Sequence, residues 1–275
     1  MSSRISALVV VTLICTLFLQ AQSKTPILTG AAAAKLFLYA GKPIHPFCLD
    51  FPFDSSRMTP IELSRCNDTP VQPSITGTEL SADYPDDGGA RLSLAGISYN
   101  VLASKAGRFL IWSAHSGGGS GQFTDLFWVR LDSRQLTYEK GEIGGDRCAG
   151  RVDIVRTEAS AIRISQAVST VDLLELASAK LDPALASRLR SGYAACDGTA
   201  NYRYDLRTEK PALLSVSLGR TEPENGDPLD PQICFDRLAQ QYAKAKNSEL
   251  NPAELKTFGR KFLQTCVQAA PGRPI

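Results

Sequence analysis

The sequence predicts an α+β fold, in which an antiparallel β-meander sheet of about six to eight strands carries packed helices and a disulfide-stapled helical hairpin at the C-terminus. Three observations carry this prediction. Short segments of alternating apolar and polar residues follow one another between residues 90 and 168. Segments with helical periodicity come after them, and six cysteines are spread over the chain beyond residue 23.

The first segment, residues 1–23, is typical of a signal peptide. It has an apolar run at 7–19, and the small residues Ala21 and Ser23 place cleavage before Lys24. The run is shorter than the roughly 20 residues that a membrane span needs, and a buried N-terminal helix is the alternative. We therefore expect a periplasmic or secreted protein whose mature chain has no membrane span.

The six remaining cysteines are an even number, which in an exported chain is typical of three disulfides. Six cysteines can pair in many ways, so their spacing must select among the pairings. Metal or redox chemistry is the alternative. It is disfavoured because the chain has no CxxC pair and only two histidines, His45 and His115.

The predicted N-terminal arm, residues 24–85, is rich in prolines, which prevent long regular elements. One turn of helix can begin at Thr59, with Pro60 in the first position. A region without a long core element needs a covalent link, so we pair Cys48 with Cys66, which both lie in it. Closing a loop of this size contributes about 3 kcal/mol on the entropic model.

A β-rich core domain is predicted over residues 86–220. Its meander strands are expected at 91–102, 108–115, 123–132, 135–143, 151–157 and 161–168. The alternation is imperfect, as in a sheet that is covered on one face.

In the later part of this domain the spacing of the apolar residues changes from the alternation of a strand to the period of a helix. A helix is predicted at 169–181, where Ser169 or Thr170 can cap it, and Pro183 begins a second short helix. A last hairpin is expected from strands at 199–207 and 212–219. We pair Cys148 with Cys196, because this link ties the hairpin and the helices to the sheet.

The C-terminal region is predicted to be a polar linker at 221–231 and a helical hairpin at 232–270. Asn251 caps the second helix, with Pro252 in its first position and Glu254 in its third. Cys234 and Cys266 lie at similar distances before and after the bend, so an antiparallel helix pair returns them to the same level. Cys234–Cys266 is the third predicted disulfide.

The catalytic candidates are Ser116, His115 and His45. The segment 114–118 follows an apolar strand and resembles the nucleophile elbow of α/β-hydrolases, where a serine lies on a tight strand-to-helix turn. The segment departs from that pattern because strand-like residues follow it, and because His115 would point to the opposite face of a strand from Ser116. A hairpin loop is the alternative. For His45, which lies between two prolines, the alternative to a catalytic or metal role is a residue fixed in a turn.

The sequence favours no cofactor, metal or nucleic acid. Lys and Arg number 30 against 28 Asp and Glu, so the net charge of +2 gives no general attraction for nucleic acid. The acidic clusters lack the spacing of a calcium loop, and the segment 144–148 lacks that of a phosphate loop. Trp112 and Trp128 can form a sugar-binding platform if exposed, and belong to the core if buried.

We therefore expect a non-catalytic exported protein that acts through a binding surface, as an envelope partner, an inhibitor or an immunity-type protein. Its partner would be a protein or a polysaccharide of the envelope. The reason is that two histidines and no intact catalytic motif leave few groups for acid–base chemistry. Two alternatives stay open: a hydrolase of envelope or extracellular polymers that uses Ser116, His115 or His45, and a carbohydrate-binding module that uses Trp112 and Trp128.

Overall fold

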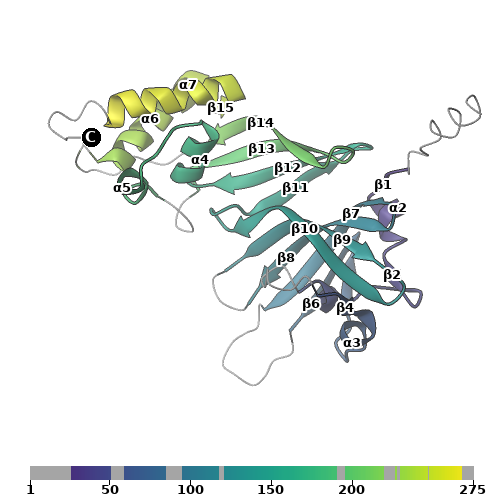
Figure 1. The fold of residues 1–275 in the computed structure, drawn as a ribbon. Helices are drawn as coiled ribbons and strands as arrows, with labels where there is room; N and C mark the ends of the chain where they lie inside the picture. Colours follow the sequence, from purple (N-terminus) through teal and green to yellow (C-terminus); the bar gives the residue numbers. More distant parts are fainter. Residues whose placement is uncertain are drawn as a thin grey trace, which may run out of the picture.

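The structure is a computed structural model, and it describes residues 26–50, 59–84, 95–117, 121–190, 196–219, 227, 230–246 and 248–267. The fold is α+β with antiparallel sheets, as the sequence predicts. The predicted signal peptide lies outside the described residues, and so does most of the predicted linker. Figure 1 shows two large sheets, with the C-terminal helices lying over the second one.

The first sheet has eight strands in the order β4-β10-β9-β8-β7-β6-β5, and β1 pairs with β7. Its long strands are β7 (Gly96–Lys105), β8 (Arg108–Ser116), β9 (Phe123–Leu131) and β10 (Gln135–Asp146). Short strands of the N-terminal arm complete it: β1 (Leu28–Thr29), β4 (Ile61–Glu62), β5 (Ser74–Thr76) and β6 (Glu79–Asp83). Between β7 and β8, Ala106 and Gly107 have φ of 52° and 76°, as a two-residue type I′ turn requires.

The second sheet has five strands in sequence order: β11 (Val152–Thr157), β12 (Ala161–Val168), β13 (Gly198–Asp205), β14 (Lys210–Leu218) and β15 (Glu249–Leu250). The prediction of one meander sheet is therefore wrong after β10. An isolated bridge between Asp146 and Ala149 closes a turn there. Arg147 and Gly150 have positive φ in this turn, which directs the chain away from the first sheet and into the second.

The helices after residue 168 follow the predicted order, whereas those of the arm were not predicted. In the arm they are α2 (Ala31–Ala34), the 3₁₀ turn η1 (Pro46–Leu49) and α3 (Leu63–Asn67), beside a small sheet of β2 (Leu38–Tyr39) and β3 (Lys42–Pro43). Later come α4 (Thr170–Leu176), α5 (Pro183–Ala186), α6 (Pro231–Lys246), α7 (Pro252–Phe262) and the π turn η2 (Leu263–Val267). The helical turn expected from Thr59 is wrong, because Ile61 and Glu62 pair with β10 and the helix begins only at Leu63.

Three apolar cores hold these layers together. The arm covers one face of the first sheet, with Phe37 packed against Phe109 and Tyr99. The other face of the first sheet meets the second sheet, and the helices pack on the second sheet further along. In β12, Ile162 and Val168 share one face by strand alternation, yet Ile162 lies in the inter-sheet core and Val168 in the helical core. One face of the second sheet is thus covered by the first sheet at one end and by helices at the other (Figure 1).

Three disulfides link the parts, in the three pairs that we predicted from the sequence. Cys48–Cys66 joins η1 to α3, Cys148–Cys196 joins the turn after β10 to the chain before β13, and Cys234–Cys266 joins α6 to η2. The second of these closes a loop with a sequence separation of 48 and connects the end of the first sheet to the second sheet.

Candidate functional site at the seam between the sheets

We call the contact between the two large sheets the seam. Its fully or nearly buried residues are Leu102, Ala103, Leu110, Leu126 and Trp128 from the first sheet, and Val152, Ile162, Ile164, Tyr204 and Leu206 from the second part of the chain. Two clefts open beside the seam, and a charged cluster closes one end of it. These three features are the candidate functional regions of the described chain.

Both tryptophans belong to the seam. Trp128 is fully buried, and its indole N–H donates to the hydroxyl of Tyr204 at 2.9 Å. Trp112 is half-buried, and its indole N–H donates to the carbonyl of Val152 at 2.9 Å. A flat platform of two exposed tryptophans is therefore not formed, because each ring ties the first sheet to the second.

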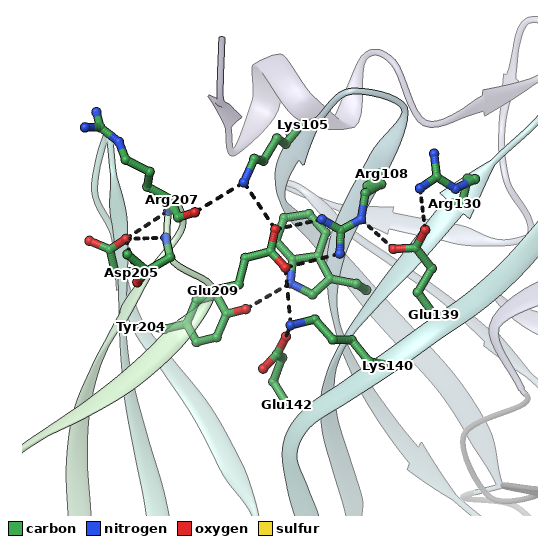
Figure 2. Close-up of polar contacts among 12 residues, drawn as sticks. Lys105, Arg108, Arg130, Glu139, Lys140, Glu142, Tyr204, Asp205, Arg207 and Glu209 are labelled. Carbon is green, nitrogen blue, oxygen red and sulfur yellow. Dashed lines mark hydrogen bonds and ion pairs between the residues drawn. The ribbon is translucent and has the colours of Figure 1, made fainter. Parts of the chain in front are cut away.

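The charged cluster, which we call the Glu209 clamp, consists of Lys105, Arg108, Lys140 and Glu209 (Figure 2). Glu209 lies in the turn between β13 and β14 at φ 56°, and it reaches the first sheet from there. Its carboxylate accepts from Arg108 at 2.7 Å and pairs with Lys105 and Lys140 at 3.2 Å each. The Arg108 guanidinium also lies 4.5 Å from the Trp128 ring centroid, a cation–π distance.

In the clamp, three cationic side chains stabilise the charged form of the Glu209 carboxylate. Burial opposes ionisation of Glu209, but hydrogen bonds from Arg108, Lys105 and Lys140 outweigh it and lower its pKa to about 2. Glu139 accepts a second hydrogen bond from Arg108 and pairs with Arg130 at 2.7 Å. No sequence pattern indicates this cluster, since its members come from three separate hairpins. Its geometry supports a fastening role between the sheets.

The first cleft, which we call the α4 cleft, measures about 500 Å³. Its floor is formed by β12 and β13, and its walls by α4 and the turn after β10. The lining includes the backbone of Gly144 and Gly150 and the polar side chains of Gln166, Ser169, Asp172, Glu175 and Tyr202. Burial and the nearby Asp172 charge raise the pKa of Tyr202, so it stays a neutral hydrogen-bonding group. Among the lining residues that the structure describes there is no Lys or Arg, so the cleft is acidic.

The α4 wall is held by local capping. Ser169 accepts from the backbone N–H of Asp172, and the Asp172 carboxylate accepts from the backbone N–H of Ser169 at 3.0 Å. This reciprocal capping box satisfies the free N–H groups of the first turn. It also leaves Asp172 and Glu175 three residues apart, on one side of the helix.

A buried polar network anchors the same helix from behind. Asp197 accepts from the backbone N–H and the hydroxyl of Thr170 at 3.0 and 2.7 Å. Gln232 of α6 donates to the Thr170 hydroxyl at 3.1 Å and accepts from the backbone of Arg190 at 2.7 Å. The Arg190 guanidinium bridges Asp197 and Asp236, both nearly fully buried. The network fixes where α4 begins and so fixes the wall of the cleft.

The second cleft, which we call the Trp112 cleft, lies beside the seam where β11 approaches β6 and β7 and measures about 370 Å³. Trp112 lines it together with Thr78, Glu79, Asn100, Asp153 and Thr157. The hydroxyl of Thr78 donates to the side-chain oxygen of Asn100 at 3.0 Å.

The structure does not bring Ser116 and His115 together as a catalytic pair. Both lie at the end of β8, where His115 pairs with Phe123 and Ser116 with Gly96. Successive residues of a strand point to opposite faces, so the two side chains diverge. The elbow segment continues a strand up to Ser116, and residue 118 lies outside the described residues.

His115 instead lies beside the carboxylate of Asp50, which is not among the predicted site residues. Its Nε2 is 3.9 Å from Asp50 Oδ1, and its ring packs edge-on against Tyr84. Burial lowers the pKa of His115, while the Asp50 charge acts in the opposite direction. No pattern in the sequence connects residues this far apart.

His45 has a capping role in the structure. It is 4% exposed, and its Nδ1 accepts from the backbone N–H of Phe47 at 3.2 Å. Its Nε2 lies 3.1 Å from the Val71 carbonyl, and its backbone N–H donates to Asn67. Burial lowers the pKa of His45, so the neutral ring that these contacts need is favoured. Both ring nitrogens are thus engaged in holding η1 and the arm.

The described residues contain no group of three or more His, Cys, Asp or Glu that could hold a metal ion. In the same part of the chain, no helix is long and apolar enough to cross a membrane. Comparison with protein-family models, with curated proteins and with solved structures gave no match.

Proposed function

We propose that this is an exported protein that acts without catalysis and binds a protein partner of the envelope through the α4 cleft. Three disulfides support location in an oxidising compartment, where disulfides persist. The predicted signal peptide points to the same compartment. An envelope partner, an inhibitor and an immunity-type protein all act through such a binding surface.

The acidic lining of the α4 cleft is the observation that carries the proposal. Asp172 and Glu175 lie on one side of α4, while Gln166 and Tyr202 add hydrogen-bonding groups from the floor. Such a cleft suits a basic side chain, a lysine or arginine that a partner inserts. Its ammonium or guanidinium group would meet carboxylates, and its apolar stem would pack on Val171 and Leu176 of the same wall.

The rigidity of the cleft supports a recognition role. The Ser169 capping box and the Asp197–Thr170 hydrogen bonds hold α4 before any partner binds. A wall that is already ordered loses less conformational entropy on binding than a mobile loop does.

Affinity capture from the native envelope tests this proposal. We expect the wild-type protein to retain one protein partner and Glu175→Lys to lose it by about tenfold or more, because the new ammonium repels the basic group. Asp132→Lys is the matched control: Asp132 is an exposed acid at the turn between β9 and β10, and its reversal should leave capture unchanged. Capture that survives Glu175→Lys, or recovery of polymer fragments alone, would overturn the proposal.

A further inference from the structure

We infer that the Trp112 cleft is a second binding site, and that its ligand is a neutral saccharide. This inference is independent of the α4 cleft, because the two clefts share no lining residue. It also replaces the two-tryptophan platform that the buried position of Trp128 excludes.

The aromatic wall of the cleft is fixed in place. Trp112 donates its indole N–H to the Val152 carbonyl, so its polar edge is satisfied and its ring is oriented by the second sheet. Trp112 is half-buried, and it is one of the residues that line the cleft. The C–H groups of a pyranose ring pack on an aromatic surface of this kind, which offers dispersion contact without a competing hydrogen bond.

The polar groups around the ring match the hydroxyls of a sugar. Thr78 occupies the side-chain oxygen of Asn100, which leaves the amide N–H groups of Asn100 as donors. Glu79 lies opposite Asn100 on the neighbouring strand and supplies acceptors. Asp153 of β11 also lines the cleft, and its Oδ1 pairs with the Arg151 guanidinium at 3.4 Å. A sugar hydroxyl both donates and accepts, so a cleft that offers an amide donor and carboxylate acceptors can satisfy several hydroxyls at once.

Charge narrows the ligand class. The described lining holds two carboxylates and no Lys or Arg, and the nearby Arg151 is paired with Asp153, so no unpaired cation of the lining attracts a phosphorylated or sulfated ligand. An ammonium ligand could also use the carboxylates and the ring, by ion pairing and cation–π contact. The Asn100 amide and the hydroxyl of Thr157 favour the neutral polyol over the ammonium ion, since they suit hydroxyl partners and an ammonium ion cannot accept the amide hydrogen bond.

The two tryptophans of the chain give a direct readout. In a ¹⁵N-correlated NMR spectrum of the purified mature protein, the two indole N–H signals are assigned with Trp112→Phe. We expect titration with cellotriose, maltotriose or tri-N-acetylchitotriose to move the Trp112 signal in a saturable way. The Trp128 signal should stay in place, because that ring is fully buried and its indole N–H is hydrogen-bonded to the hydroxyl of Tyr204.

Two variants and one organic cation distinguish a saccharide site from a site for ammonium groups and from the α4 cleft. Asn100→Ala should weaken the affinity of the best sugar by about fivefold or more, through loss of a hydrogen-bond donor. Glu175→Lys, in the α4 cleft, should leave the titration unchanged whether or not it abolishes partner capture, so the two proposals fail separately. The inference is overturned if none of the three sugars moves the Trp112 signal, if Asn100→Ala binds as wild type, or if tetramethylammonium moves the signal where the sugars do not.

Discussion

Asp125 lies in β9, in a partly buried position where a charge is costly. Burial raises its pKa from the ordinary value of 3.8 to about 6. Gly144 on the neighbouring strand makes room for it, since a Cβ atom there would lie 2.1 Å from Asp125 Oδ1. The same Cβ atom would lie 2.8 Å from the backbone carbonyl oxygen of Thr124, which cannot move aside as a side chain can, so glycine is required at this position.

The raised pKa predicts how stability changes with pH. Between pH 3.8 and about 6 the folded protein holds a proton on Asp125 that the unfolded chain has released, so the free energy of unfolding falls as the pH rises through this window. Asp125→Asn removes the ionisation. We expect the free energy of unfolding of this variant to exceed that of the wild type by about 1–3 kcal/mol at pH 8 and to equal it near pH 3.5. Urea unfolding at several pH values measures the difference, and a gap that does not grow with pH would contradict the assignment.

The buried network around Arg190 shows what residue patterns leave open. Asp197 and Asp236 share this one guanidinium although Arg190 and Asp236 are 46 positions apart. In the sequence each is an ordinary charged residue, with nothing that marks it as buried. Only the packing of α6 on the second sheet brings these groups together, which is why they are not among the predicted sites.

At the scale of elements, boundaries were predictable where a local chemical signal marks them. The strand expected at 161–168 is confirmed at both ends, because a compact turn precedes it and the Ser169 capping box follows it. Asn251 and Pro252 begin α7 as their residue types predict. The partners of the strands were not predictable, because an alternating pattern identifies a strand but not the sheet that it joins.

The cap of α7 gives a test at this scale. The Asn251 side chain accepts from the backbone N–H groups of Ala253 and Glu254 at 2.9 and 3.1 Å. We expect Asn251→Ala to lower the free energy of unfolding by about 1 kcal/mol, and Asn251→Ser, which keeps an acceptor, to lower it by less than half of that. Chemical denaturation followed by circular dichroism measures both. Equal losses in the two variants would show that the cap hydrogen bonds are not the cause.

At the scale of the whole molecule, the seam decides which surfaces exist. The seam buries both Trp128 and Tyr204, which are joined by a hydrogen bond, and the two clefts lie beside it. The disulfide Cys148–Cys196 links the sheets near the α4 cleft, and the Glu209 clamp links them at the β13–β14 turn. The Cys148–Cys196 pairing was predictable from the order of the predicted segments that it ties together. The clamp and the clefts depend instead on how two sheets stack, and this relation between distant hairpins has no local signature.

The Glu209 clamp predicts an acid-sensitive seam. Its carboxylate has an ordinary pKa of 4.5 and a folded pKa of about 2, so its contribution to stability is present above pH 4.5 and is lost as the pH falls towards 2. Glu209→Gln leaves three cations without their shared anion. We expect it to lower the free energy of unfolding at pH 7 by about 1–2 kcal/mol, after allowance for screening by solvent.

The same variant should loosen the seam itself, and not only the overall fold. Hydrogen exchange at the Trp128 indole should become faster in Glu209→Gln at pH 7, because the clamp no longer holds Arg108 over the ring. Glu158→Gln is the matched control: Glu158 pairs with Arg156 and Arg163 in partly exposed positions of the second sheet, outside the seam, and its loss should leave that exchange unchanged. Two outcomes would show that the clamp does not fasten the two sheets: a difference in unfolding free energy between Glu209→Gln and the wild type that is as large at pH 2 as at pH 7, or equally fast exchange in the control. The shape of both clefts would then depend on the apolar seam and the disulfide alone.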